Sequence, residues 1–261
     1  PKKDRSTTAA AASHSLAMPP ILKENEKLLG RYVVLGGRPI GAGQFAEVFK
    51  AYDDFAENGG PEDNLVAVKI EKEDKTLSRE LKALRDLQGC KGVCGYLDSA
   101  TGRHPFIVMQ LVGENLADVR SRLNHFDNRH SMRTLGWIGA QMLDILQEIH
   151  DKGYVHRDVK PANVTLGLVK GGGGGAAAAA DLLSARKLYL VDFGLAKKFE
   201  TSPASGGSKG SEGFRGSTTY ASVHAHNGES QGPRDDLWSL LYMLAECHEG
   251  TLPWRVLKEG R

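Results

Sequence analysis

Two short polar motifs, read in order, restrict the fold of this chain more than any other feature of its sequence. The first, His156–Asn163, reads HRDVKPAN. The second, Asp192–Gly194, reads DFG and directly follows the apolar run Leu188–Val191. An H-R-D-x-x-x-x-N string followed by D-F-G is a specific pattern, because the two motifs must agree in order, spacing and context. The chain is therefore expected to fold so that both motifs reach one site.

The polar residues of the two motifs suit phosphoryl transfer. Asp158 can orient an attacking hydroxyl and accept its proton, whereas Asn163 and Asp192 are hard oxygen ligands suited to Mg²⁺ held against phosphates. Taken singly, each residue has a simpler explanation: His156 as a packed core histidine, Asp158 as a helix cap and Asp192 as a turn residue. These explanations do not account for the joint order of the residues, so we predict a catalytic site.

The first half of the chain has the pattern of an antiparallel meander with one helix. Strand-like runs at 32–35, 47–52 and 65–70 are separated by turn-rich segments, and apolar runs near 93–97 and 105–112 complete the sheet. Residues 76–88 read as a helix with one apolar stripe, and Gly89 is a suitable stop; the stripe consists of Leu77, Leu81, Leu84 and Leu87.

Glu80 lies on that apolar stripe, where a charge needs a partner to be tolerated. Lys69, at the end of the third strand, is the expected partner.

The preceding segment Ile40–Val48, IGAGQFAEV, contains a glycine-rich turn between two strands, which by itself is more often only a tight hairpin. Lys69 favours a phosphate-covering loop instead, because a lysine on that strand can reach the α- and β-phosphates. Ala46 stands where a third loop glycine is expected, and we predict that it only tunes nucleotide handling unless the position needs a positive φ.

The second half is mostly helical. Apolar residues from Leu135 to Ile149 have helical spacing, and this helix is expected to end at Gly153. Residues 237–247 form another helix that is apolar on nearly every side, which predicts a buried central helix. Residues 171–180, five glycines followed by five alanines, are a low-complexity insertion, and residues 197–213 should be mobile.

The N-terminal residues 1–28 show no apolar period and are expected to be a disordered tail, with Met18 a candidate true start. A transit peptide is the alternative, which Asp4, Glu24 and Glu26 weaken.

The 34 basic and 32 acidic residues leave a net charge near zero, so the totals give no reason to expect nucleic acid or a membrane as a partner. Three cysteines without metal-type spacing predict reduced thiols, and we expect a soluble monomer of the cytoplasm, the nucleus or both. Cys90, Cys94, His224 and His226 are expected to be structural.

The ordered set Lys69, Glu80, Asp158, Asn163 and Asp192 resembles the eukaryotic protein kinase family over roughly residues 30–258. Within that family the segments MQLVGENLAD (109–118), GFRG (213–216), YAS (220–222) and DDLWSL (235–240) are similar to the casein kinase one superfamily, and the closest branch is that of the tau-tubulin kinases. The resemblance implies an α+β, two-lobe fold: a small lobe over residues 29–112, with an antiparallel sheet and one helix, and a mostly helical large lobe over residues 113–261.

The resemblance also implies an enzyme that transfers phosphate from ATP, with Mg²⁺, to serine and threonine of protein substrates, with cytoskeletal proteins among the candidates. Lys160 fits the serine/threonine pattern and would join Asp158, Lys69 and Glu80 as a catalytic residue beside the transferred phosphate. Met109 would be the gatekeeper, and the backbone of Gln110 and Val112 would bind adenine. The nucleotide site would further include Ile40, Gly41, Gly43, Val48, Ala67 and Lys69, with Asn163 and Asp192 as metal ligands.

Two departures from the family pattern matter. Thr219 stands where the family commonly has an arginine, which removes a binder of acidic or phosphorylated substrate residues and argues against a preference for primed substrates. The chain stops at Arg261 whereas family members continue with further helices, so we expect an incomplete large lobe with exposed apolar surface on residues 237–254. The alternative function is a kinase-fold scaffold, or pseudokinase-like binding module, without catalysis.

Overall fold

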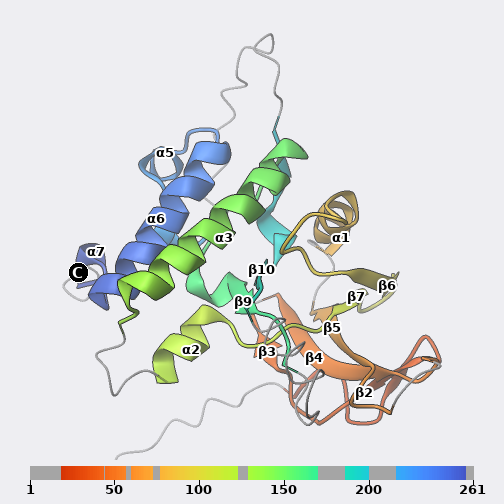
Figure 1. Cartoon of the computed structure of the whole chain (residues 1–261). Coiled ribbons are helices and arrows are strands. Elements are labelled where there is room, and N and C mark those ends of the chain that lie inside the picture. The colour runs from red at the N-terminus through yellow and green to blue at the C-terminus, as the bar shows by residue number, and fades with distance from the viewer. Residues whose placement is uncertain are drawn as a thin grey trace, which may run out of the picture.

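An antiparallel sheet occupies one end of the molecule and a set of helices the other (Figure 1). The structure is a computed structural model that describes residues 19–43, 45–56, 60–72, 77–122, 129–169, 186–199 and 216–256. This arrangement confirms the α+β, two-lobe fold expected from the sequence. The insertion 171–180 lies outside the described residues.

The sheet has seven strands in the order β1-β2-β4-β5-β7-β6, and β3 pairs with β4. Its register sets the site, because Val48 pairs with Lys69 and Ala67 pairs with Met109. Paired residues of antiparallel strands share a face, so these four side chains lie on one side of the sheet. The strands are β1 Lys27–Leu28, β2 Tyr32–Val34, β3 Gly41–Ala42, β4 Ala46–Asp53, β5 Leu65–Glu71, β6 Tyr96–Ala100 and β7 Phe106–Gln110.

The two faces of the sheet pack in different ways. Phe49, Val68 and Val108 belong to a core on the outer face, together with Tyr32 of β2. On the other face Ile107 joins the main core, to which helix α1, Leu77–Asp86, contributes Leu77 and Leu84. Helix α1 ends at Asp86, two residues before the predicted end at residue 88, and the turn that follows reaches Gly89, which has φ 87°.

The helical part is built on two long helices that lie side by side, α3 Met132–Asp151 and α6 Pro233–Glu249 (Figure 1). The Oγ atom of Ser131 caps α3 by accepting the N–H of Thr134 at 3.2 Å. The shorter helices are α2 Leu116–Arg122, α5 Val223–His226 and α7 Pro253–Val256. The helical part also contains two short antiparallel strand pairs: β8 Tyr154–Val155 with β11 Lys197–Lys198, and β9 Val164–Leu166 with β10 Leu188–Leu190.

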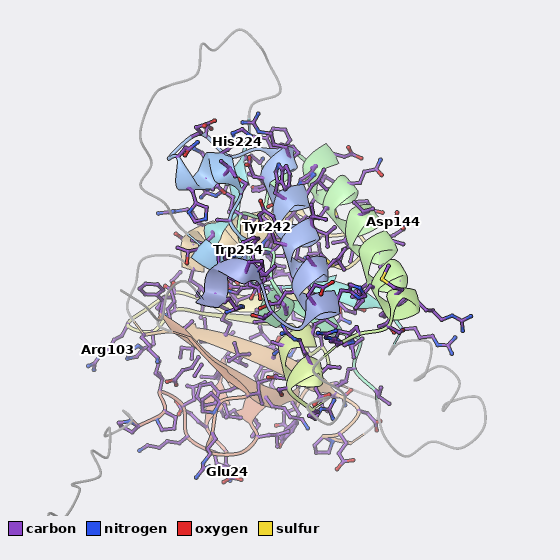
Figure 2. The ribbon with its side chains drawn as sticks, turned by 90° about the vertical axis from the view of Figure 1, so that its left-hand side faces the viewer. Glu24, Arg103, Asp144, His224, Tyr242 and Trp254 are labelled. Carbon is purple, nitrogen blue, oxygen red and sulfur yellow. The ribbon has the colours of Figure 1, made fainter. Side chains whose placement is uncertain are left out.

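The prediction that residues 237–247 form a helix buried on nearly every side is wrong. Leu237, Trp238 and Leu241 are 43%, 43% and 52% exposed. The buried side of α6 instead carries three acids, Asp235, Asp236 and Glu246, beside apolar residues such as Leu240 and Met243. Aromatic rings connect α6 to α7: the ring centroids of Tyr242 on α6 and Trp254 on α7 lie 5.1 Å apart (Figure 2). This agrees with the expectation of exposed apolar surface on residues 237–254.

Three further expectations need correction. Leu22 is only 3% exposed and β1 pairs with β2, so residues 19–28 pack on the sheet and are no disordered tail; residues 1–18 lie outside the described part. Residues 197–198 form β11, whereas 200–215 also lie outside the described part. The strand expected near 93–97 begins at Tyr96, because Val93 and Cys94 are buried in the turn before it.

All three cysteines of the chain are buried and unpaired, as expected for structural thiols. Burial raises the pKa of the Cys94 thiol to about 12 and that of Cys247 to about 11. Among the described residues no helix combines the length and the apolar character that crossing a membrane requires.

Candidate active site

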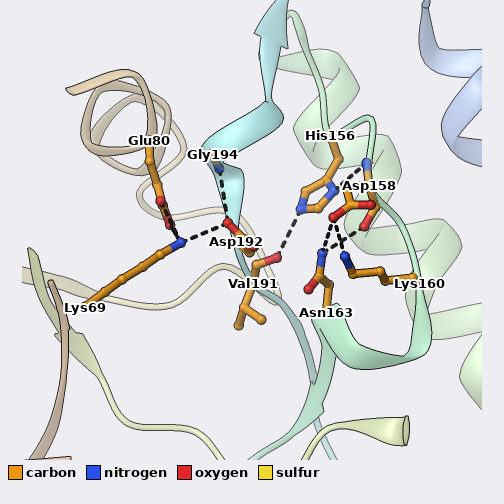
Figure 3. A network of polar contacts seen from close by, with 9 residues as sticks. All are labelled: Lys69, Glu80, His156, Asp158, Lys160, Asn163, Val191, Asp192 and Gly194. Atoms are coloured by element: carbon orange, nitrogen blue, oxygen red, sulfur yellow. Dashed lines mark hydrogen bonds and ion pairs between the residues drawn. The ribbon is translucent and has the colours of Figure 1, made fainter. Parts of the chain in front are cut away.

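Lys69 of β5 joins two carboxylates that come from distant parts of the chain (Figure 3). Its Nζ lies 2.7 Å from both carboxylate oxygens of Glu80 on α1 and 2.8 Å from Oδ1 of Asp192. The predicted partnership between Lys69 and Glu80 is confirmed. Because the Glu80 side chain is only 5% exposed, this ion pair fixes the position of Nζ.

The charges of Lys69, Glu80 and Asp192 shift one another's pKa values. Burial alone would lower the pKa of Lys69, but the charges of Glu80 and Asp192 reverse this effect and raise it. Burial raises the pKa of Glu80, and Lys69 opposes that shift. Burial would also raise the pKa of Asp192, yet the charge of Lys69 lowers it to about 2. One ammonium group between two carboxylates leaves an excess negative charge, which favours a cation.

The motif that begins at Asp192 has a specific backbone geometry. Asp192 has φ 67° and ψ 75°, a left-handed conformation that costs a non-glycine residue about 1–2 kcal/mol. The turn buries Phe193 to 2% exposure, with its ring edge-on to that of His156 at 5.0 Å between centroids. Burying Phe193 leaves the Asp192 carboxylate directed toward Lys69 (Figure 3).

His156 is a buried histidine whose two ring nitrogens both have partners. Its Nε2 lies 3.1 Å from the carbonyl oxygen of Val191, and its Nδ1 lies 3.3 Å from the N–H of Asp158. A carbonyl must accept and an N–H must donate, so the contacts assign the proton to Nε2. His156 thereby ties the first motif to the residue that precedes the second.

Asp158 lies in a dense set of hydrogen bonds and is 8% exposed. Asn163 Nδ2 donates to its carbonyl oxygen at 2.9 Å and to Oδ2 at 3.1 Å, and Lys160 Nζ lies 2.7 Å from Oδ2. The N–H of Ser217 donates to Oδ1 at 3.1 Å. Since Lys160 Nζ also donates to Ser217 Oγ at 3.0 Å, Ser217 belongs to the same cluster. The sequence analysis did not identify Ser217.

Asp236 of α6 is the functional residue that sequence reasoning missed most clearly. It is 1% exposed, and its carboxylate accepts the N–H groups of His156 and Arg157, each at 2.8 Å. It also contacts Nε2 of His150 at 2.8 Å. Arg157 has φ 68°, a conformation that these bonds hold in place. The DDLWSL segment was noticed in the sequence, but nothing local to it indicates this contact.

The two motifs are joined at the backbone next to the predicted metal ligands. The N–H of Val191 donates to the carbonyl oxygen of Asn163 at 2.9 Å, which holds Asn163 close to the residue before Asp192. The Nδ2 of Asn163 is bonded to Asp158, so its Oδ1 is the atom suited to a cation. Among the described residues no group of three or more His, Cys, Asp or Glu side chains could hold a metal. Two protein ligands fit Mg²⁺, which takes its remaining ligands from water and phosphates.

The predicted nucleotide-binding residues lie on the strands next to Lys69 and in the segment after β7. Gly41 and Gly43 lie in the β3–β4 hairpin, next to the 56% exposed Ile40, and Val48, Ala67 and Met109 share the sheet face of Lys69. Gln110 ends β7, and Val112 follows it two residues later. Ala46 begins β4 and is not among the described non-glycine residues with positive φ. The position therefore does not need a glycine, as the prediction for Ala46 required.

Gly113, which follows Val112, lies in the passage from the sheet to the helices, between β7 and α2. Its N–H donates to the carbonyl oxygen of Leu166 at 2.8 Å, and a Cβ at this position would lie 2.8 Å from the carbonyl oxygen of Gly167. Only glycine permits so close an approach. The connection between sheet and helices is therefore held directly against β9.

Comparison with known proteins agrees with this geometry. Residues 35–260 match the family model described as the protein kinase domain. The chain belongs to the protein kinase family. This kinase chain is 38% identical over 242 residues to a protein of Dictyostelium discoideum named as a serine/threonine-protein kinase. It is 34% identical over 228 residues to one of Caenorhabditis elegans named as a casein kinase I. Both names are provisional assignments.

The alignments cover 88% and 84% of this kinase chain. They cover 43% and 61% of the respective relatives, so the chain spans about half the length of the curated relatives it matches.

Proposed function

We propose that the chain acts as an ATP- and Mg²⁺-dependent protein kinase that phosphorylates serine and threonine hydroxyls of proteins. The observation that carries the proposal is the set of contacts that brings both motifs to one site: Glu80 and Lys69 are bonded to Asp192, and Asn163, which is bonded to Asp158, is held by the N–H of Val191, the residue before Asp192. These contacts gather the lysine, the carboxylates and the amide that phosphoryl transfer requires. Mg²⁺, when bound, would neutralise the charge of the phosphates.

Each residue would then have one role. Asp158 orients the substrate hydroxyl and accepts its proton, and Lys160, bonded to it, stabilises the charge of the transferred group. Asn163 and Asp192 would hold Mg²⁺. Lys69 binds the phosphates in the position that Glu80 gives it, and catalysis comes mainly from positioning and electrostatics.

The nucleotide would lie between the sheet and the segment after β7. The hairpin residues Gly41 and Gly43 would cover its phosphates, and the backbone of Gln110 and Val112 would bind adenine beside the gatekeeper Met109. The side chains expected to pack against the base and ribose are Ile40, Val48 and Ala67; the sheet register supports this for Val48 and Ala67, which share the face of Lys69.

A cavity of about 430 Å³ borders Lys160 and supports a protein substrate. It is lined by α2, residues 160–162, Tyr220 and Arg255, and a peptide placed there would reach Asp158 next to Lys160. Within the family we propose the tau-tubulin branch of the casein kinase one superfamily, with cytoskeletal substrates among the candidates. Thr219 argues against a preference for primed substrates. The three unpaired thiols support a reducing compartment, the cytoplasm or nucleus.

The experiment is a phosphotransfer assay with Mg-ATP on libraries of serine, threonine and tyrosine peptides, comparing the wild type with Asp158→Asn. We expect transfer to serine and threonine but not to tyrosine, and a loss of about 10²–10⁴-fold in Asp158→Asn. Asp144→Asn is the matched control, because Asp144 is exposed on α3 away from the site (Figure 2). Stabilisation by ATP without any transfer would favour the scaffold function instead.

A further inference from the structure

Helix α1 is attached to the segment that follows Asp192 at a second place, far from Lys69. Its last residue, Asp86, accepts the hydroxyl of Tyr154 through Oδ2 at 2.8 Å, and Lys198 Nζ lies 3.0 Å from the same oxygen. Tyr154 belongs to β8 and Lys198 to β11, and the two residues are direct partners in that strand pair. We call Asp86, Tyr154 and Lys198 the α1 clamp.

The members of the α1 clamp hold one another in place. Lys198 Nζ lies 5.2 Å from the centroid of the Tyr154 ring, within the range of a cation–π contact. The N–H of Phe199 donates to the carbonyl oxygen of Gly153 at 2.9 Å, which continues the pairing of β8 and β11 by one residue. Asp86 therefore meets a preformed pair of donors.

The clamp completes a two-point attachment of α1. Glu80 is bound to Lys69, which is bound to Asp192, and Asp86 is bound to Lys198, six residues further along the chain than Asp192. Glu80 and Asp86 are themselves six residues, or about 9 Å, apart on the helix. One attachment would let the helix pivot, whereas two attachments to one short segment fix its rotation and the direction of Glu80.

We propose that the α1 clamp positions Glu80 against Lys69, so that Tyr154 and Asp86 are positioning residues for phosphoryl transfer. This inference rests on the proposed kinase function. It also gives residues 197–198 a role, because β11 carries Lys198 and pairs with β8, which carries Tyr154.

The hydroxyl of Tyr154 should contribute more than the ammonium group of Lys198. Tyr154 is 4% exposed, and a hydrogen bond from a buried donor shifts an equilibrium by up to about tenfold. The Lys198 side chain is 56% exposed, and an exposed ion pair shifts it by about fivefold at most. Tyr154→Phe is accordingly the decisive variant.

The chain offers a matched control in Tyr32, which is 1% exposed and donates its hydroxyl to Asp98 at 3.4 Å. Tyr32→Phe removes the same atom from a buried tyrosine beside an aspartate, but on the outer face of the sheet. We expect Tyr154→Phe to lower kcat/KM for ATP by about 3- to 10-fold, and Tyr32→Phe to change it by less than about twofold. Equal effects of the two variants would overturn the proposal.

A double mutant separates positioning from general destabilisation. In a Glu80→Gln background α1 no longer carries a charged partner for Lys69, so the clamp has nothing to position, and adding Tyr154→Phe should change kcat/KM by less than about twofold. The full effect of Tyr154→Phe in that background would contradict the proposal.

If the wild type transfers no phosphate, the proposed function fails, and the clamp is then tested by amide hydrogen exchange. Exchange across α1 should be faster in Tyr154→Phe than in Tyr32→Phe. Equal exchange in the two variants would overturn the clamp by itself.

Discussion

The residues around Asp158 and those around Lys69 meet in one site, but different interactions hold them. Asp158, Lys160 and Asn163 lie within six residues of one another, Asn163 and Lys160 bond to Asp158, and the N–H of the nearby His156 is bonded to Asp236. Lys69, Glu80 and Asp192 come from three separate parts of the chain, with Asp192 123 positions after Lys69, and only charged hydrogen bonds between their side chains join them. The Asp158 group is therefore fixed by the local chain, whereas the Lys69 group depends on how α1 and the sheet sit against the helices.

The largest effect is expected from Asp236→Ala, which tests whether the Asp158 group is fixed by the backbone. The N–H groups of His156 and Arg157 would lose a buried acceptor. An unpaired buried N–H costs about 1–3 kcal/mol, so the free energy of unfolding should fall by about 3 kcal/mol, and phosphotransfer should be lost. Chemical denaturation and the peptide assay measure both. Asp151→Ala, at an exposed position that ends α3, should change neither. Retained stability in Asp236→Ala would show that Asp236 is no anchor.

Glu80→Gln tests the Lys69 group. In contrast to Asp236→Ala, it should have a large effect on activity but only a small one on stability. Lys69 loses one charged partner but keeps Asp192 at 2.8 Å, so its buried charge is not left uncompensated. We expect kcat/KM for ATP to fall by about 10- to 100-fold, and the free energy of unfolding to change by about 1 kcal/mol. A loss of stability as large as that of Asp236→Ala would remove the difference between the groups.

Gly216→Ala tests the backbone beside Ser217, which donates to Asp158. Gly216 has φ 123°, and an added Cβ would lie 2.9 Å from the carbonyl oxygen of Arg157. We expect a loss of about 2 kcal/mol in the free energy of unfolding and a several-fold lower kcat. Gly228→Ala is the control, since Gly228 has φ 72° but nothing within 4 Å of an added Cβ. It should cost about 1 kcal/mol and leave kcat unchanged. Equal results for the two glycines would mean that the contact with Arg157 is unimportant.

Ala46→Gly should have the smallest effect, because Ala46 does not adopt a positive φ. We expect a change of less than about 1 kcal/mol in stability and less than about twofold in KM for ATP. Steady-state kinetics over a range of ATP concentrations measures the second quantity. A much lower KM would show that the hairpin needs the third glycine after all. It would also show that the proposed nucleotide-covering loop limits the binding of ATP beside Lys69.

Patterns along the sequence predicted the parts of the fold that depend on local periodicity. The strands β4 and β5, helix α1 and the pairing of Lys69 with Glu80 follow from apolar stripes and from the need of a buried charge for a partner. The role of Asp236 could not be predicted, because an acid in the first turn of a helix is explained equally well by the helix dipole. Its partner at His156 is 80 residues away.

The exposed side of α6 was mispredicted for a related reason. Counting apolar residues around the helix places every leucine in the core, but the buried side is decided by which residues have partners. Glu246 is 1% exposed because Arg120 and Arg255 pair with it, while Leu241 is 52% exposed. Likewise, the packing of Leu22 depends on the sheet beneath it and not on any pattern in residues 19–28.

The burial of all three thiols makes this chain well suited to chemical labelling. Thiolates react with maleimides and with electrophilic inhibitors, and Cys94 and Cys247 remain protonated because burial raises their pKa to about 12 and about 11. Cys90 is 8% exposed, and its pKa is also raised by burial. A single cysteine introduced on the surface would therefore be the preferred target of a fluorescent or spin label, and a pair placed on α1 and α3 would report the distance between the two lobes without prior removal of the native cysteines.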